Sequence, residues 1–121
     1  MDDGLGSCTV WCKALNLFNM FYYVYVLISL RDRNFYIGFT TDLNERITRH
    51  HNGDVSSTKN RRPVELIFYE AYLEKLDALR RERYFKTTKG KATIRVMLNK
   101  YLEKIDSGRK KGDNKKKIRL L

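Results

Sequence analysis

The sequence predicts an α+β fold, in which a three-stranded antiparallel sheet is flanked by helices in the order β-β-α-β-α-α. Three observations predict it. Two neighbouring apolar runs, 21–30 and 35–39, are separated by a four-residue polar break, as in a β-hairpin. A third run rich in β-branched and aromatic residues covers 64–73. Between and after these runs, apolar residues recur at helical spacing.

The first two strands form the hairpin. Phe21 to Leu30 is rich in Tyr, Val, Leu and Ile, which favours a buried strand, and Phe35 to Phe39 is a shorter strand of the same kind. The polar residues Arg31 to Asn34 suit the connecting loop. Because side chains alternate along a strand, we expect Tyr23 and Tyr25 to share one face of the sheet.

Signals for the first helix follow the hairpin. Asp42 and Glu45 fit a capping box, and Asn52-Gly53 is a usual end signal. The polar, basic stretch 54–62 predicts a surface loop that Pro63 ends, before the third strand.

Two more helices are expected after the third strand. Residues 75–87 show a helical pattern, which Gly90 breaks. Residues 92–105 then place Ile94, Met97, Leu98, Tyr101 and Ile105 on one apolar face, as in an amphipathic helix.

The chain divides into a leader, 1–19, a domain, 20–106, and a basic tail, 107–121, which we expect to be disordered. The pattern changes at Met20, so either Met20 is the true start or the leader is a loose appendage. A short helix over 10–18 that packs on the domain is an equally open interpretation. Cys8 and Cys12 lack the spacing of a zinc or redox motif and are expected to be reduced thiols.

Composition narrows the class of protein. A hydrophobic fraction of 42% is typical of a chain that forms a globular core. The sequence contains no run of eighteen apolar residues that could span a membrane, so we expect a cytoplasmic protein. The 25 Lys and Arg against 14 Asp and Glu give a net charge of +11. Such a chain attracts nucleic acid, although a solvated basic surface or a ribosome-associated protein fits the same charge.

Five residues are candidates for chemistry. Tyr25 and Tyr36 lie on the two arms of the hairpin, although strand tyrosines are also common in cores. Arg46 and His50 are four residues apart and share one helical face. Glu82 is a carboxylate among arginines, a pattern also typical of exposed salt bridges.

The order of these residues resembles a known signature. Tyr36-Ile37-Gly38 resembles the second half of the GIY-YIG nuclease motif, and Tyr23-Val24-Tyr25 stands where the first half is expected. The arginine that the family places on the following helix falls on Arg46, and the histidine or tyrosine four residues later falls on His50. The family's metal-binding glutamate falls on Glu82.

The resemblance covers Phe21 to about Glu103. Segments 57–63 and 69–72 resemble the same segments of small stand-alone bacterial members of the family. These members are related to the N-terminal nuclease domain of the incision subunit of DNA excision repair. Many members carry an asparagine in the last helix, for which Asn99 is only a loose candidate.

The resemblance implies an endonuclease that hydrolyses DNA with Mg²⁺ or Mn²⁺. Tyr25 would be the general base, and Tyr36 would orient water or share that role. Arg46 and His50 would bind the phosphate and its developing charge, and Glu82 would bind the metal. All five side chains should then line one concave, positively charged surface.

Other basic residues would hold the substrate. Lys59, Arg61, Arg62 and the tail would grip the DNA backbone without reading its sequence. Two alternatives share the same residues: a catalytically weak nucleic-acid-binding module of the same fold, and an RNA-directed nuclease. The sequence does not name a protein partner.

Overall fold

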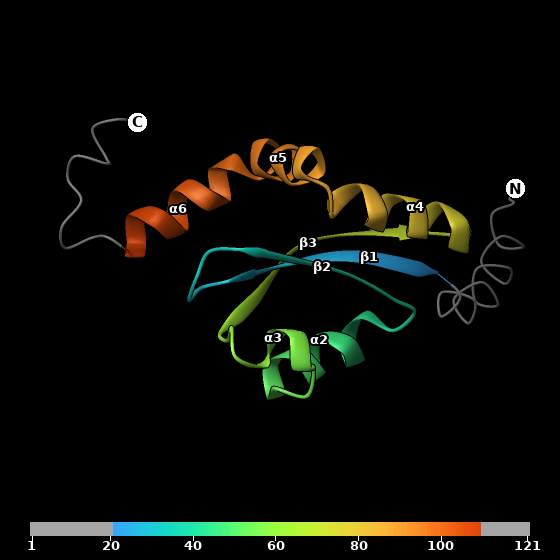
Figure 1. Ribbon diagram of the computed structural model, residues 1–121, viewed down its shortest axis with the longest axis horizontal. Helices are drawn as coiled ribbons and strands as arrows, with labels where there is room; N and C mark the ends of the chain where they lie inside the picture. The colour runs from blue at the N-terminus through green and yellow to red at the C-terminus, as the bar shows by residue number, and fades with distance from the viewer. Residues whose placement is uncertain (1–20, 110–121) are drawn as a thin grey trace, which may run out of the picture. The chain divides into compact units, whose positions relative to one another are not determined.

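The computed structural model describes residues 21–109 (Figure 1). The predicted leader, with Cys8 and Cys12, and residues 110–121 of the predicted tail lie outside the described residues. The chain falls into two compact units, one ending at Tyr84 and the other beginning at Phe85. The sheet and the candidate residues belong to the first unit.

Three strands form one antiparallel sheet, as predicted: β1 (Tyr22–Ser29), β2 (Phe35–Thr40) and β3 (Val64–Tyr72). The strand order is β2-β1-β3, so the first strand is central. Its residues from Val24 to Ser29 are all buried, which agrees with its nearly continuous apolar sequence. The α+β class is therefore confirmed.

The pairing register fixes which side chains share a face. Tyr25 lies opposite Gly38 on β2 and Tyr69 on β3, and these three residues belong to one face. Val24 lies opposite Glu70, and both therefore belong to the other face.

One irregularity interrupts the pairing of β1 with β3. Val26 pairs with Phe68, but the next residue, Leu27, pairs with Leu66. Ile67 is thus an extra residue on β3, as in a β-bulge.

A helix covers the face that carries Tyr25. In α2 (Leu43–Asn52) the Asp42 side chain accepts a hydrogen bond from the Glu45 backbone N–H at 3.1 Å, and Gly53 ends the helix with φ +84°. The N-cap at Asp42 and the end signal at Gly53 are confirmed, but the second half of the capping box is not, because the Asp42 N–H donates to Thr40 Oγ1 at 3.1 Å. The expected surface loop 54–62 contains one helical turn, α3 (Ser56–Lys59), which the polar composition of the segment did not reveal.

The fourth helix, α4 (Lys75–Phe85), lies on the opposite side of the sheet from α2 and α3 (Figure 1). Arg81 of α4 donates to both carboxylate oxygens of Glu70, at 3.0 and 3.2 Å. Because Glu70 belongs to the Val24 face, α4 packs on the face away from Tyr25.

The second unit corrects the prediction for the last helix. Instead of a break at Gly90 and one helix over 92–105, the chain forms α5 (Thr88–Met97) and α6 (Asn99–Arg109). The Thr87 hydroxyl accepts the Gly90 N–H at 2.9 Å, so this glycine lies inside a capped first turn. α6 continues into the predicted tail as far as Arg109. No helix within 21–109 is long and apolar enough to cross a membrane.

Candidate active site

Tyr25 is the centre of a buried polar cluster on the sheet face beneath α2. Its side chain has no exposed surface, and its Oη lies 2.9 Å from Nε2 of His50. The ring lies across Gly38 on the neighbouring strand. A Cβ at Gly38 would come within 2.3 Å of the Tyr25 hydroxyl, so only glycine leaves room for the ring.

His50 joins α2 to the sheet. It lies in the last turn of the helix, is fully buried, and packs edge-on against the rings of Tyr25 and Tyr36, with centroid distances of 5.6 and 5.1 Å. Its other ring nitrogen, Nδ1, lies 2.8 Å from Oγ1 of Thr58, which is also fully buried. Sequence reasoning missed Thr58, because a threonine in a polar loop gives no periodic signal.

Tyr36 is the more accessible of the two tyrosines. It is half-buried on the edge strand β2, and its ring centroid lies 6.3 Å from that of Tyr25. Together with Leu43 and Ile47 of α2, it packs against the core cluster that contains Tyr25. The predicted meeting of the two tyrosines over one sheet face is therefore observed.

Arg46 brings a permanent positive charge to this cluster. Its guanidinium acts on the Tyr25 hydroxyl by charge and by hydrogen bonding, and both effects lower the pKa of Tyr25. Its Nε is buried and has no hydrogen-bond partner among the described residues. A buried donor left unsatisfied costs about 1–3 kcal/mol, so this nitrogen is suited to an oxygen of a bound anion.

Burial controls the protonation of the cluster. Desolvation, and then the neighbouring Tyr36, raise the pKa of Tyr25 above its usual value in spite of Arg46. Desolvation also lowers the pKa of His50 to about 4, with a further contribution from the positive charge of Arg46. At neutral pH, Tyr25 is therefore protonated and the His50 ring is neutral.

Glu82 is placed differently from the other four candidates. It is half-buried in the last turns of α4, beside Arg81, which pairs with Glu70 on the face away from Tyr25. The structure thus brings together Tyr25, Tyr36, Arg46 and His50, whereas the helix that carries Glu82 packs on the other side of the sheet.

Few metal-ligating side chains lie close together in the described part of the chain. Within residues 21–109, no three His, Cys, Asp or Glu side chains form a cluster that could enclose a metal ion. Mg²⁺ commonly keeps several of its waters and takes only one or two carboxylates, with substrate phosphates as further ligands. The residues present fit only this open mode of binding, for which Glu82 is the candidate.

The predicted backbone-gripping residues lie in and after α3. The Lys59 and Arg62 side chains are exposed, and Arg62 donates to the backbone oxygens of Lys59 and His51 at 3.1 and 3.3 Å. Arg61 pairs with Asp32 of the hairpin loop at 3.4 Å. These arginines therefore have structural partners in addition to any role in binding.

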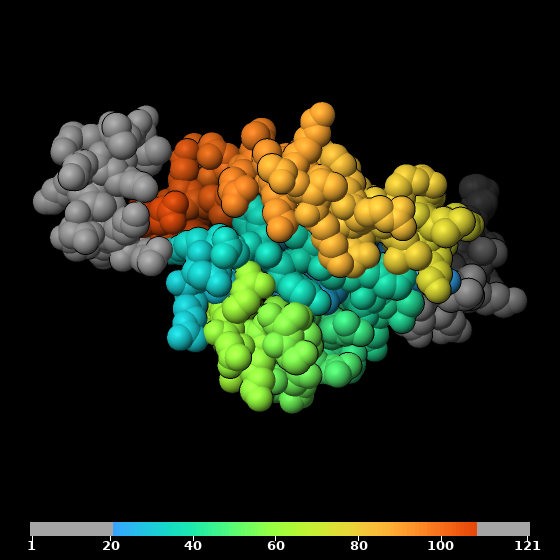
Figure 2. Space-filling model, in the orientation of Figure 1, coloured from blue at the N-terminus to red at the C-terminus, as the bar shows by residue number. Residues whose placement is uncertain are grey.

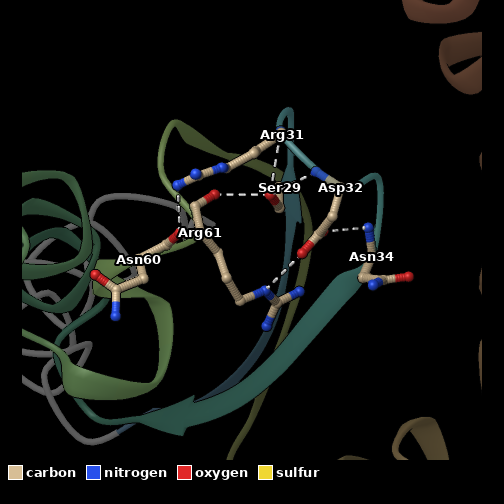
Figure 3. A network of polar contacts seen from close by, with 6 residues as sticks. All are labelled: Ser29, Arg31, Asp32, Asn34, Asn60 and Arg61. Carbon is tan, nitrogen blue, oxygen red and sulfur yellow. Dashed lines mark hydrogen bonds and ion pairs between the residues drawn. The ribbon is translucent and has the colours of Figure 1, made fainter.

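A hydrogen-bond network holds the hairpin loop against the segment after α3 (Figure 3). The buried Ser29 hydroxyl donates to the backbone oxygen of Arg61 at 2.7 Å and accepts from the backbone N–H groups of Arg31 and Asp32. Arg31 donates to the Asn60 backbone oxygen at 2.8 Å. The two segments, cyan and yellow-green in Figure 2, accordingly lie side by side on the surface.

Comparison with known proteins gives one family and several relatives. Residues 21–95 match the model of the GIY-YIG catalytic domain. The UPF0213 protein YazA of Bacillus subtilis is 44% identical over 69 residues, which are 56% of this chain and 67% of that protein. A UPF0213 protein of Staphylococcus epidermidis is 42% identical over 67 residues, 54% of this chain and 80% of that protein. One of Pediococcus acidilactici is 33% identical over 81 residues, 64% and 82% of the two chains. No solved structure matches.

Proposed function

Because this chain belongs to the GIY-YIG nuclease family, we propose that it is a metal-dependent endonuclease that hydrolyses phosphodiester bonds of DNA. The observation that carries the proposal is the convergence of four side chains from three separate elements. Tyr25 of β1, Tyr36 of β2, and Arg46 and His50 of α2 form one cluster on one sheet face. A merely structural core has no need of a guanidinium beside a buried phenol and imidazole.

Arg46 is the phosphate-binding residue of the proposed site. The guanidinium stays charged at any physiological pH and matches the oxygens of a phosphate. Its unpartnered, buried Nε supports this role. Lys59, Arg61 and Arg62 bind the DNA backbone, where the contacts add affinity without sequence preference.

Tyr25 acts as general base only if its own proton can leave, because its pKa is raised and it is protonated at neutral pH. His50 Nε2 lies 2.9 Å away and accepts that proton. As the attacking water gives a proton to Tyr25 Oη, the Tyr25 proton moves to Nε2. The hydroxide forms a bond to phosphorus, the bond to the leaving oxygen breaks, and that oxygen takes a proton from solvent. The imidazolium then returns its proton to solvent.

Tyr36 is the residue that orients the attacking water. It is half-buried rather than fully buried, and it lies on the edge strand beside Tyr25 and His50. Tyr36 is thus the more exposed of the two tyrosines.

Glu82 is the residue that would hold the divalent cation. When bound, Mg²⁺ or Mn²⁺ would neutralise charge on the phosphate and lower the pKa of a bound water. A single carboxylate suits a mostly hydrated ion, but α4 packs on the sheet face away from Tyr25, so this role requires that Glu82 reach the phosphate from the edge of the sheet.

Cleavage by the purified full-length chain tests the proposal. Plasmid, branched and single-stranded DNA are incubated with Mg²⁺, with Mn²⁺ or with EDTA, and nicked and linear products are quantified. We expect metal-dependent cleavage that Tyr25→Phe and Arg46→Ala reduce by about 10²-fold or more, the range that such catalytic groups contribute. A wild-type protein that is folded, binds DNA and cuts none of these substrates contradicts the proposal.

Glu82→Gln is the test of the metal ligand. The substitution removes the charge and keeps the shape, so we expect it to abolish metal-dependent cleavage while the melting temperature stays within a few degrees. The exposed Glu74→Gln, which removes the same charge just before α4, is the matched control and should cleave like wild type. Full activity of Glu82→Gln would show that another group binds the metal.

The position of α4 favours one second candidate, a nucleic-acid-binding module of the same fold that cleaves weakly. The helix that carries Glu82 packs on the sheet face away from Tyr25. Binding of DNA without cleavage in any metal supports this candidate. RNA versions of the same substrates distinguish an RNA-directed nuclease from one that acts on DNA.

A further inference from the structure

A chain of hydrogen bonds runs inward from Tyr25 and ends beyond the residues that the family signature contains. Tyr25 Oη contacts His50 Nε2 at 2.9 Å, and His50 Nδ1 contacts Thr58 Oγ1 at 2.8 Å. The Thr58 hydroxyl in turn donates to the Val55 backbone oxygen at 3.5 Å. The three side chains have no exposed surface, so their polar groups depend on these contacts.

The direction of these hydrogen bonds follows from their two ends. At the inner end, the Val55 backbone oxygen can only accept, so its 3.5 Å contact with Thr58 Oγ1 requires the single proton of that hydroxyl. Thr58 Oγ1 is therefore the acceptor of a proton carried by His50 Nδ1. A neutral imidazole carries one N–H, so Nε2 keeps its lone pair and accepts from Tyr25.

The outer end gives the same direction. Arg46 has only donors, so in its hydrogen bond with Tyr25 the phenol oxygen is the acceptor. Tyr25 also hydrogen-bonds with Tyr36, so its one proton is shared between the Tyr36 hydroxyl and Nε2 of His50. The bonds from Arg46 through Tyr25, His50 and Thr58 to the backbone of Val55 are thus compatible with one direction.

We propose that Thr58 is a positioning residue that fixes His50 in the Nδ1–H tautomer, so that Nε2 is the acceptor for the proton of Tyr25. The proposal rests on the proposed function for its role in catalysis, but the tautomer itself is a property of the protein alone. With the opposite tautomer, Nε2 would donate to Tyr25 and could not take its proton. The route by which Tyr25 acts as a base would then be closed.

The fold holds Thr58 in place from both sides. Thr58 lies in the single turn of α3, where its backbone N–H also donates to the Val55 oxygen, at 3.1 Å. The segment that follows is tied to the hairpin loop through Ser29 and Arg61 (Figure 3). The distance between Oγ1 and the His50 ring is thus set by contacts on two elements.

Nuclear magnetic resonance tests the tautomer without any activity. The chain has two histidines, so His51→Gln leaves the His50 ring as the only imidazole. The ¹⁵N shifts of that ring distinguish a protonated nitrogen from an unprotonated one. We expect protonated Nδ1 and bare Nε2 in this background at neutral pH. Protonated Nε2 would overturn the inference, whether or not the protein is a nuclease.

Substitution of Thr58 tests its role in fixing the tautomer. Thr58→Val keeps the shape and removes the acceptor, so the proton should move to Nε2 and the ¹⁵N shifts of the two nitrogens should exchange. Thr58→Ser keeps the hydroxyl and should retain the wild-type shifts. An unchanged spectrum in a folded Thr58→Val protein contradicts the proposal. If Thr58→Val does not fold, the proposal is tested by the His50 tautomer in the His51→Gln protein and by the ¹⁵N spectrum of Thr58→Ser.

Cleavage kinetics then separate the inference from the proposed function. We expect kcat of Thr58→Val to fall by about 10²-fold with KM little changed, because proton transfer is lost and DNA binding is not. Thr58→Ser should restore most of kcat, and the exposed Thr48→Val on α2 is the matched control. Wild-type kcat in Thr58→Val overturns the catalytic role. If the wild-type protein does not cleave DNA, the proposed function is refuted. The ¹⁵N spectra of His50 then still test the tautomer.

Discussion

At the scale of single residues, the site depends on how closely side chains approach one another. The Tyr25 ring occupies the space where any other residue at position 38 would place its Cβ. The same packing excludes water from His50 and gives its ring a low pKa. The close fit of the Tyr25 ring and the low pKa of His50 therefore both result from the same tight packing. Substitutions that loosen this packing should disturb both.

Gly38→Ala tests the steric fit. The added methyl would lie 2.3 Å from the Tyr25 ring and hydroxyl, so the ring must move away from His50. We expect a loss of about 1–3 kcal/mol in the free energy of unfolding, as for other overpacked cores, and loss of cleavage. Denaturant melts and plasmid assays measure the two effects. Gly108→Ala in α6, where a Cβ would meet nothing within 4 Å, is the control and should not lower stability.

The lowered pKa of His50 predicts a pH dependence of stability. The folded protein holds this ring neutral down to about pH 4, whereas the unfolded chain protonates it near pH 6.5. Between these values the unfolded state binds more protons, so the free energy of unfolding falls as pH falls through this window, by up to about 3 kcal/mol.

His50→Gln should lose this part of the pH dependence, whereas the exposed His51→Gln should keep it. Urea melts from pH 7.5 to 4 measure the difference between the two variants. Parallel curves for both would show that the His50 ring titrates normally in the folded state.

At the scale of elements, a loop-to-loop network positions the segment that carries Thr58. Ser29 is the hub of this network, because its buried hydroxyl makes one bond as donor and two as acceptor. The network connects the end of β1 to the residues just after α3 and therefore holds together segments that are about thirty residues apart.

Ser29→Ala should lower the free energy of unfolding by about 1–3 kcal/mol, since it removes three hydrogen bonds from part-buried backbone groups. We also expect faster amide hydrogen exchange in α3, measured by mass spectrometry, because the anchor of the following segment is lost. Ser57→Ala, an exposed position in α3, serves as the control and should exchange at the wild-type rate. Equal exchange in both variants would mean that Ser29 does not position α3.

Much of the fold could be predicted from the sequence because its signals are local. The strand pattern of β1 and the cap at Asp42 are each written in a few neighbouring residues, and both are observed. The predicted start of the helix at residue 92 was wrong. Gly90 was interpreted as a helix break, but it lies in the first turn of α5, which the Thr87 hydroxyl caps. The turn of α3 was missed because its four residues carry no apolar pattern.

The candidate site was predicted in part, for a different reason. Arg46 and His50 were assigned by resemblance to the family, and helical spacing predicted that they share one face. Thr58 and the protonation of Tyr25 depend on contacts between segments far apart in sequence, which spacing along the chain does not encode. The placement of α4 on the opposite face involves a pair, Arg81 with Glu70, that no local pattern reveals.

At the scale of the whole molecule, the net charge of +11 should favour association with nucleic acid. Part of this charge lies close to the candidate site, at Lys59 and Arg62, which are exposed. Another part lies at the end of the sequence, where residues 110–121 contain six basic residues and one acidic residue. Both parts should contribute to affinity through release of counterions from DNA.

Replacement of the six basic residues in 110–121 by glutamine should weaken DNA binding and flatten its dependence on salt. Each phosphate contact that is lost lowers the log–log slope by about 0.9. Fluorescence anisotropy from 50 to 300 mM salt measures the slope. Replacement of Lys59 and Arg62 by glutamine provides the comparison. A slope that the first replacement leaves unchanged would mean that this segment does not contact DNA.

The extra residue on β3 has a consequence for the lengths that related sequences can adopt. Leu66 and Tyr69 point to the same sheet face although they are three positions apart, because Ile67 is taken up by the irregularity in pairing. Deletion of Ile67 would make the pairing between β1 and β3 continuous, and Leu66 and Phe68 would stay on their present sheet faces. Deletion of one residue elsewhere in the strand would invert every side chain beyond it. Natural length variation in β3 should therefore concentrate at position 67, two residues before Tyr69, the residue that pairs with Tyr25.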